Sequence, residues 1–351
     1  MNEIDIKKIN STIIISLSRE KVLNALNLNM VREIYKNIEN WNKDEDVSGV
    51  IIQGSGDKSF CAGGDIVSVY HSKTDAKSNL SDLFFREEYI LNLAIANFSK
   101  PWISLLNGIA MGGGLGLSVH GKYRIVNNKT ITAMPETAIG LFPDVGGGYF
   151  LSRMGELGLY LALTGNVMNG LDSMFAGIGT HFIENEKIEL VYEEIINKKN
   201  YNNEFIDKLL HKNSKSFLAN ESSLFKDIDN IKKHFCKNTL KEIFDSLKLE
   251  NSEWTKNILS ILSKKSPTSM SVALKQLSLA KNLNLKDCLL MEFRICQAMM
   301  AKHDFYEGVR ANLVDKDRNP KWEPDNINEI NEEIINSHFY NLGDKELFSN
   351  E

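Results

Sequence analysis

The sequence predicts an α/β fold in its first half and an almost wholly helical second half. Two β-branched runs, residues 12–17 and 49–54, flank a stretch whose apolar residues recur at helical intervals, which gives the order strand, helix, strand. From residue 187 onward the chain is rich in lysine and asparagine, with apolar residues at helical spacing. We therefore expect an α/β core over residues 1–190 that carries the active site, and a helical region over residues 191–351 that packs on it.

The residues around the first predicted helix support this order. Asn24 and Asn27 precede the helix predicted over residues 30–41, and asparagine side chains accept hydrogen bonds from the unpaired first amides of a helix. The strand GVIIQG that follows is apolar through its centre, as expected when both faces of a strand are covered. A buried sheet is the expected framework of the first half.

A glycine pair and a long helix come next. The sequence SFCAGGD at residues 59–65 is either an ordinary strand-to-helix connection or a loop whose backbone N–H groups approach a ligand where a Cβ would block it. Residues 83–98 predict a helix with an apolar face, ended by Pro101. Glu87 and Glu88 lie on this helix, and because adjacent helical residues point about 100° apart, at most one of them is expected to face inward.

The stretch over residues 107–150 places glycine runs beside two acids, Glu136 and Asp144. A helix is expected to begin at the glycine run that follows Met111, and helix N-termini favour negative charge. A dinucleotide-binding motif is weak, because Leu117 stands where its third glycine would be, and no GK[ST] follows as a Walker loop requires. The elements predicted here are strands over 101–108, 123–126 and 130–133, and helices over 111–120 and from residue 146.

The second half consists mainly of predicted amphipathic helices. Residues 288–302 carry apolar groups on most faces and are expected to lie between layers, whereas residues 304–322 look turn-rich. The other helices are predicted over residues 188–199, 205–210, 240–247, 254–262 and 269–279.

Charge and composition exclude several classes of function. The net charge is −5 with acids and bases interspersed, so no basic stripe for nucleic acid or an anionic membrane is expected. The cysteines show no metal-binding spacing, so neither a zinc site nor a disulfide framework is indicated. The N-terminal residues resemble neither a secretory signal nor a transit peptide, and no apolar run approaches the roughly 20 residues of a membrane span. We expect a cytoplasmic protein, or a mitochondrial one if the source is eukaryotic.

Two glycine loops and two acids together suit chemistry on a carbonyl group. Backbone N–H groups at Gly63–Gly64 and Gly112–Gly113 would stabilise an oxyanion, and a carboxylate beside it would act as general base or nucleophile. Burial would raise the pKa of such a carboxylate toward a useful value. Taken singly, Glu136 and Asp144 are also compatible with ordinary turn and capping roles.

At these residues the chain resembles the crotonase (enoyl-CoA hydratase/isomerase) superfamily. FCAGGDI at residues 60–66 is similar to the first oxyanion loop of that family, and NGIAMGGGLGLS at residues 107–118 is similar to the second. The resemblance implies that the amides of Gly64 and Gly113 form the oxyanion hole that holds the thioester oxygen of an acyl-CoA. It also implies a spiral of ββα units followed by a helical C-terminal region.

Three further stretches resemble the branch of this superfamily that hydrolyses 3-hydroxyisobutyryl-CoA in valine degradation: residues 84–92, 133–151 and 303–322. This resemblance implies that Glu136 and Asp144 are the catalytic pair. It also implies that Glu88, Gly113, Glu136 and Asp144 contact the substrate, that CoA enters only as part of the substrate, and that neither a cofactor nor a metal is needed.

A departure from the hydratase pattern favours hydrolysis. Hydratases carry a second catalytic glutamate where Gly116 stands here, and they usually have glycine where Asp144 stands. We expect Glu136 either to attack the thioester or to deprotonate water, and Asp144 to hydrogen-bond the 3-hydroxyl of the substrate. The alternatives are an enoyl-CoA hydratase or isomerase and a non-catalytic acyl-CoA-binding or interaction protein. A homo-oligomer is possible in each case, and 3-hydroxypropionyl-CoA is a second candidate substrate.

Overall fold

The computed structural model describes residues 3–74 and 78–349, which form two compact units interleaved along the chain. Each unit is built from three segments. Unit 1 consists of Met1–Gly64, Ile90–Ala133 and Val167–Lys226, and unit 2 of Asp65–Tyr89, Met134–Asn166 and Asp227–Glu351. The predicted division into residues 1–190 and 191–351 concerns continuous segments of sequence and stays a prediction.

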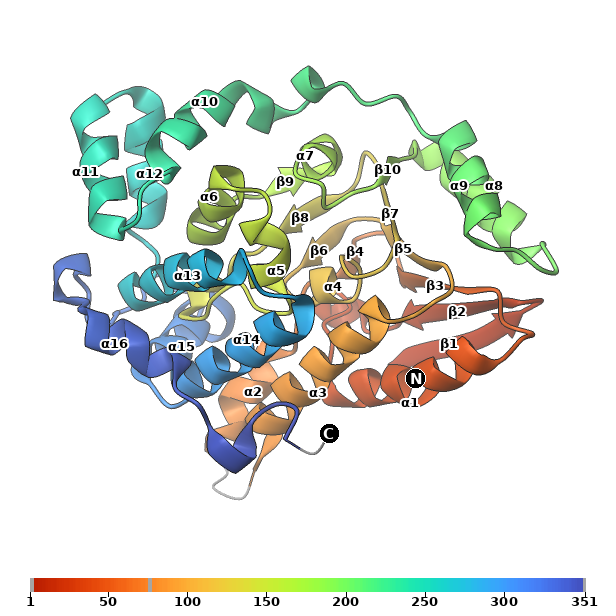
Figure 1. The fold of residues 1–351 in the computed structure, drawn as a ribbon, viewed down its shortest axis with the longest axis horizontal. Helices are drawn as coiled ribbons and strands as arrows, with labels where there is room; N and C mark the ends of the chain where they lie inside the picture. The colour runs from red at the N-terminus through yellow and green to blue at the C-terminus, as the bar shows by residue number, and fades with distance from the viewer. Residues whose placement is uncertain (1–2, 75–77, 350–351) are drawn as a thin grey trace. The chain divides into compact units, whose positions relative to one another are not determined.

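Unit 1 contains two β-sheets (Figure 1). The larger sheet consists, in spatial order, of β1 (Ile4–Ile9), β2 (Thr12–Leu17), β3 (Gly49–Gly54), β5 (Trp102–Leu106), β7 (Tyr123–Val126) and β10 (His181–Phe182). The smaller sheet consists of β4 (Ser59–Cys61), β6 (Ile109–Met111), β8 (Ile131–Ala133) and β9 (Met168–Asn169). Strand β1 runs antiparallel to β2 and β9 antiparallel to β8, while the other neighbours are parallel.

Consecutive strands alternate between the two sheets. The pairs β3–β4, β5–β6 and β7–β8 each place one strand in the larger sheet and the next in the smaller sheet. A helical segment follows each pair: α2 (Ile66–Ser72), α4 (Gly113–Gly116) and the 3₁₀ helix η2 (Glu136–Ile139). This repeated strand–strand–helix order confirms the predicted ββα units.

Strands β2 and β3 and helix α1 (Leu28–Lys43) agree with the sequence prediction. Helix α1 is capped as expected, because the side chain of Asn27 accepts a hydrogen bond from the amide of Met30 at 3.0 Å. Strand β1 was not predicted. Its sequence, IDIKKI, carries three charges and leaves side chains exposed along the edge of the sheet, so it lacks the apolar continuity of a central strand.

The glycine-led helix predicted over residues 111–120 is wrong in its length. Met111 ends strand β6, and α4 is a single turn followed by a turn-rich stretch to His120. Three of its four residues, GGLG, are glycines, which are poor helix formers because they lose the most backbone entropy. The helix nevertheless begins at the predicted place.

The core of unit 1 lies on one face of the larger sheet. Ile14, Ile51 and Ile103 from three neighbouring strands are fully buried there. They pack with apolar side chains of α8 (Asn185–Ile196) and α9 (Asn203–Asn213), which match the helices predicted in this region. Burial of each such side chain contributes roughly 1.5–3 kcal/mol relative to its exposure, so this layer fixes the sheet.

Unit 2 is helical. Helix α3 (Leu80–Ala96) begins in unit 2, and α10 (Ser223–Phe235) ends in it. The longer helices of unit 2 are α6 (Glu156–Thr164), α11 (Leu240–Glu250), α12 (Glu253–Leu262), α13 (Pro267–Ala280) and α14 (Leu285–Met300). The shorter ones are α2, α5 (Gly147–Ser152), α15 (His303–Val309) and α16 (Glu332–Asn336). Helix α14 is buried on most faces, as predicted, whereas α10 and α15 were not predicted.

None of the helices in the described ranges combines the length and apolar character that a membrane span requires.

Candidate active site

Glu136 is the first residue of η2, the short 3₁₀ helix that follows β8. The preceding proline sets the backbone for a tight turn, and the helix ends after one turn at Gly140, whose φ is +69°. Glu136 is 5% exposed, and its Oε2 has no hydrogen-bond partner in the described residues. A buried, unpartnered carboxylate oxygen is costly for folding alone, so it points to a ligand.

Two hydrogen bonds from other parts of unit 2 hold the backbone of helix η2. The amide of Ser266 donates to the carbonyl of Thr137 at 3.1 Å, and Asn312 Nδ2 donates to the carbonyl of Ala138 at 2.8 Å. Asn312 lies in a π-helical turn, Arg310–Val314, which continues α15. Wide turns of this kind are frequent at functional sites because they redirect a side chain.

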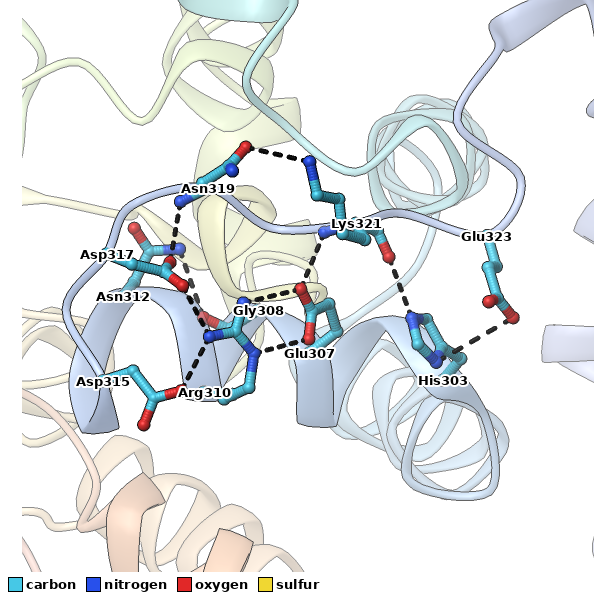
Figure 2. Close-up of polar contacts among 10 residues, drawn as sticks. All are labelled: His303, Glu307, Gly308, Arg310, Asn312, Asp315, Asp317, Asn319, Lys321 and Glu323. Atoms are coloured by element: carbon cyan, nitrogen blue, oxygen red, sulfur yellow. Dashed lines mark hydrogen bonds and ion pairs between the residues drawn. The ribbon is translucent and has the colours of Figure 1, made fainter.

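A network of charges fixes that π-helical turn (Figure 2). Arg310 donates two hydrogen bonds to Glu307, at 2.8 and 2.9 Å, and one each to Asp315 and Asp317 at 2.7 Å. Glu307 also accepts a hydrogen bond from the amide of Lys321 at 2.7 Å. Glu307 therefore joins helix α15 to the later segment that contains Lys321. The charged segment over residues 303–322 therefore fixes Asn312, which in turn holds the backbone of η2 at Ala138.

Asp144 lies in the loop between η2 and α5 and is 4% exposed. Its Oδ2 accepts a hydrogen bond from the hydroxyl of Tyr89 at 2.8 Å. The next residue, Val145, has φ of +51°, a left-handed conformation that a β-branched residue adopts only under constraint. Such strain occurs where the surroundings force a functional geometry.

Glu88 is the acid of the Glu87–Glu88 pair that faces inward, as expected for at most one of them. Glu88 is 1% exposed, whereas Glu87 is half-buried. The Oε1 of Glu88 also has no hydrogen-bond partner in the described part of the chain. Unit 2 thus contains two buried acids, Glu88 and Glu136, with an unpartnered oxygen each.

The three predicted acids influence one another. Burial raises the pKa of Glu136 well above its usual value, and the charge of Asp144 raises it further. Burial likewise raises the pKa of Glu88, with further increases from Asp144 and Glu136. The pKa of Asp144 is raised to about 7 by burial, against the lowering effect of the Tyr89 hydrogen bond. Like charges in one buried site favour shared protons, so the protonation of each of these acids depends on that of the others.

Lys265 supplies a positive charge to this group. Its charge lowers the pKa of Glu136, and its own pKa is lowered to about 8, chiefly by burial. The ammonium lies 3.3 Å from the position that a Cβ on Gly165 would occupy, and that position is 2.9 Å from the Cα of Pro135. Lys265 is therefore placed beside the backbone that leads into Glu136.

The predicted oxyanion glycines lie in unit 1, where their two loops meet. Gly64 pairs with Leu26 in an isolated parallel bridge, and the amide of Leu26 donates to the carbonyl of Gly63 at 2.8 Å. A Cβ on Gly63, whose φ is +118°, would lie 3.9 Å from the amide nitrogen of Gly113. Gly113 is the first residue of α4, where amides have no partner within the helix.

The structure thus brings Glu88, Glu136 and Asp144 together in unit 2, and Gly64 and Gly113 together in unit 1. Sequence reasoning missed Tyr89 and Lys265. Tyr89 directly follows Glu88 on a helix rich in aromatic residues, where nothing distinguishes a tyrosine with a buried hydrogen bond from one that only packs. Lys265 stands in a lysine-rich segment, and a sequence pattern does not show which lysine is buried.

No group of three or more metal-binding side chains in the described ranges is arranged to hold a metal ion.

Comparisons with known proteins show which family the chain resembles. The sequence model of the family described as enoyl-CoA hydratase/isomerase matches residues 12–339. The mitochondrial 3-hydroxyisobutyryl-CoA hydrolase of Homo sapiens is 45% identical over 349 residues, which cover 98% of this chain and 90% of the human protein. The protein of that name from Xenopus laevis is 47% identical over 341 residues, covering 95% and 88% of the two chains.

Solved structures show the same fold over the whole chain. A carnitinyl-CoA dehydratase from Mycobacterium thermoresistibile superposes with a TM-score of 0.92 at 32% identity, covering 100% of this chain and 99% of its own. An enoyl-CoA hydratase from Rhodobacter sphaeroides superposes with a TM-score of 0.90, also at 32% identity, covering 99% of each chain. The predicted fold class, a crotonase-like spiral with a helical C-terminal region, is confirmed, and the chain belongs to the enoyl-CoA hydratase/isomerase, or crotonase, family.

Proposed function

We propose that this protein hydrolyses the thioester of 3-hydroxyisobutyryl-CoA to the free 3-hydroxy acid and CoA, and that it also accepts 3-hydroxypropionyl-CoA. The observation that carries the proposal is the pair Glu136 and Asp144, both buried, with an unpartnered oxygen on Glu136 and Asp144 oriented by Tyr89. The names of the human and Xenopus relatives support the substrate. The hydratase alternative is disfavoured, because Gly116 stands where a hydratase has its second glutamate.

In the proposed reaction the amides of Gly64 and Gly113 donate to the thioester oxygen, which gains negative charge as the carbonyl is attacked. By one route Glu136 takes a proton from water, hydroxide adds to the carbonyl carbon, the C–S bond breaks, and the proton passes to the departing sulfur. By the other route the Glu136 carboxylate attacks the carbonyl and expels the thiolate, and water then opens the mixed anhydride. Mass spectrometry of rapidly quenched enzyme separates the routes, because only the second leaves an acyl group on Glu136.

Asp144 and Glu88 are proposed to hydrogen-bond the substrate rather than to activate the attacking water. Asp144 accepts a hydrogen bond from the 3-hydroxyl, and a site built to pair a hydroxyl rejects analogues that lack it. Glu88 is held protonated by burial, since its pKa is raised well above its usual value, and so it offers a hydrogen-bond donor to the bound acyl-CoA.

The variant Glu136→Gln tests the proposal. The amide keeps the shape of the side chain but acts neither as base nor as nucleophile, so thiol release from 3-hydroxyisobutyryl-CoA should fall by roughly 10²–10⁴-fold while calorimetry shows acyl-CoA binding nearly unchanged. Glu250→Gln is the matched control, because Glu250 accepts hydrogen bonds from Lys233 and His234 on the neighbouring helix and belongs to no part of the site. Near-normal turnover by Glu136→Gln would remove Glu136 from the reaction.

Two further assignments complete the proposal. The relatives are named mitochondrial, whereas we propose a cytoplasmic protein, which fractionation of the source cells tests. We also propose a homo-oligomer, which light scattering of the purified protein tests directly.

A further inference from the structure

A buried glutamate outside the predicted site hydrogen-bonds to the backbone of the loop that carries Asp144. Glu292, on helix α14, is fully buried, and its two carboxylate oxygens accept hydrogen bonds from two backbone amides of that loop. The amide of Gly146 donates to Oε2 at 2.7 Å, and the amide of Gly148 donates to Oε1 at 2.8 Å. One side chain therefore holds two amides of the same loop, one with each carboxylate oxygen.

A second buried side chain holds the other end of the loop. Gln276, on helix α13, is fully buried, and its Nε2 donates to the carbonyl of Pro143 at 2.8 Å and to Glu292 Oε1 at 3.1 Å. The loop is therefore fastened on both sides of Asp144, at residue 143 before it and at residues 146 and 148 after it. The side chain of Asp144 is oriented separately, by the hydrogen bond from Tyr89.

Glu292 and Gln276, which we call the clamp, explain two features that the acids alone leave unexplained. Val145 keeps a left-handed φ of +51°, and fixed neighbours on both sides supply the constraint that such a conformation requires. A Cβ on Gly148 would stand 3.0 Å from both Gln276 Nε2 and Glu292 Oε1, so a larger residue here would crowd both side chains. The glycine run that follows Asp144 thus admits the two clamping side chains to the backbone.

We propose that Glu292 and Gln276 are positioning residues that fix the direction of Asp144 and thereby set the selectivity of the site for acyl groups with a 3-hydroxyl. The inference rests on the proposed hydrolase function, to which it adds a determinant of specificity. Misplacement of a positioned group by about 1 Å costs on the order of a hundredfold in rate, and only a substrate that bonds to Asp144 would suffer that loss in full.

The test compares Glu292→Gln with wild type and with Glu250→Gln. The amide side chain of Glu292→Gln keeps its volume but turns an NH₂ group toward one of the two loop amides, so one hydrogen bond is lost. We expect the ratio of kcat/KM for 3-hydroxyisobutyryl-CoA to that for isobutyryl-CoA to fall by about tenfold or more, toward the ratio of Asp144→Ala. The control should keep the wild-type ratio. A ratio unchanged in Glu292→Gln, with Asp144→Ala reducing it, would overturn the inference while leaving the proposed function intact.

A measurement without substrate makes the clamp testable even if the hydrolase proposal fails. Hydrogen exchange of the amides of Gly146 and Gly148 should be faster in Glu292→Gln than in Glu250→Gln, while amides of helix α1 stay protected in both. Equal protection at the two glycines would overturn the clamp itself. Gln276→Met serves where Glu292→Gln does not fold, and it should loosen the loop at residue 143 with a smaller fall in the ratio, because it removes no bond to Gly146 or Gly148.

Discussion

Replacing Asp144 with asparagine should make the protein more stable at alkaline pH while impairing its selectivity. The folded protein keeps a proton on this carboxyl up to about pH 7, whereas the unfolded chain releases it near 3.8. The contribution of this carboxyl to the wild-type free energy of unfolding is therefore fully present below about pH 4 and is lost as the pH rises through 7. An asparagine at this position carries no titrating group, so the variant lacks this loss.

The size of the effect follows from the two pKa values. A change from 3.8 to about 7 corresponds to roughly 4 kcal/mol once Asp144 is ionised in both states. The side chain is 4% exposed, so solvent screens little of it. Loss of the negative charge also lowers the pKa values of Glu88 and Glu136, which Asp144 raises, and this acts in the same direction. The charge of Asp144 also raises the pKa of Glu292, so the pKa of Glu292 should fall in the variant as well.

Urea unfolding of Asp144→Asn and wild type at about pH 4.5 and about pH 8 measures the difference. We expect the advantage of the variant to grow by about 3 kcal/mol between these conditions, with equal m-values. Glu250→Gln is the control of opposite sign: hydrogen bonds from Lys233 lower the pKa of Glu250 to about 2, so its contribution is present above about pH 4.5 and the variant should be less stable than wild type at pH 8. A variant at Asp144 that is destabilised equally at both pH values would refute the reasoning.

Three further substitutions probe the surroundings of the acids. Tyr89→Phe removes the hydrogen bond that lowers the pKa of Asp144, so the acid limb of the pH dependence of kcat/KM should move to higher pH; an unmoved limb would mean that Asp144 does not control it. Lys265→Met removes the charge that lowers the pKa of Glu136, so maximal turnover should require a higher pH than in wild type, and a profile identical to wild type would contradict the pairing. Gly140→Ala would place a Cβ 2.1 Å from a backbone oxygen at a φ of +69°, so thermal unfolding should show a loss of about 2 kcal/mol or more, and a variant as stable as wild type would count against the tight turn after Glu136.

The sequence predicted the strands and helices whose apolar pattern is strong. Strands β2 and β3 were located correctly because their β-branched runs have no polar interruption. Strand β1 and helix α10 were missed, because a charged edge strand and a helix in a lysine-rich stretch carry weak patterns. The alternation of strands between two sheets depends on pairing across distant parts of the chain, which periodicity does not contain.

The same limit applies to the site. Glu136, Asp144 and Glu88 could be selected because they stand in recognisable stretches of sequence. Glu292 could not, since it lies about 150 residues beyond the loop it holds, in a helix whose pattern predicts only burial. A buried acid on an apolar helix is nevertheless a signal that sequence reasoning can use, because burial of an unpaired carboxylate is costly and a partner must exist.

In the smaller sheet of unit 1, the strands determine the fold, while the connections after them carry the proposed reactive residues. Its parallel strands β4, β6 and β8 are followed along the chain by the Gly63–Gly64 loop, the Gly112–Gly113 turn and the turn of Glu136, in that order. Each connection can change its residues without altering the pairing of the strands. A family with this plan can keep the two glycine loops and exchange acids among the remaining connections, so new reactions on CoA thioesters require substitutions rather than a new fold.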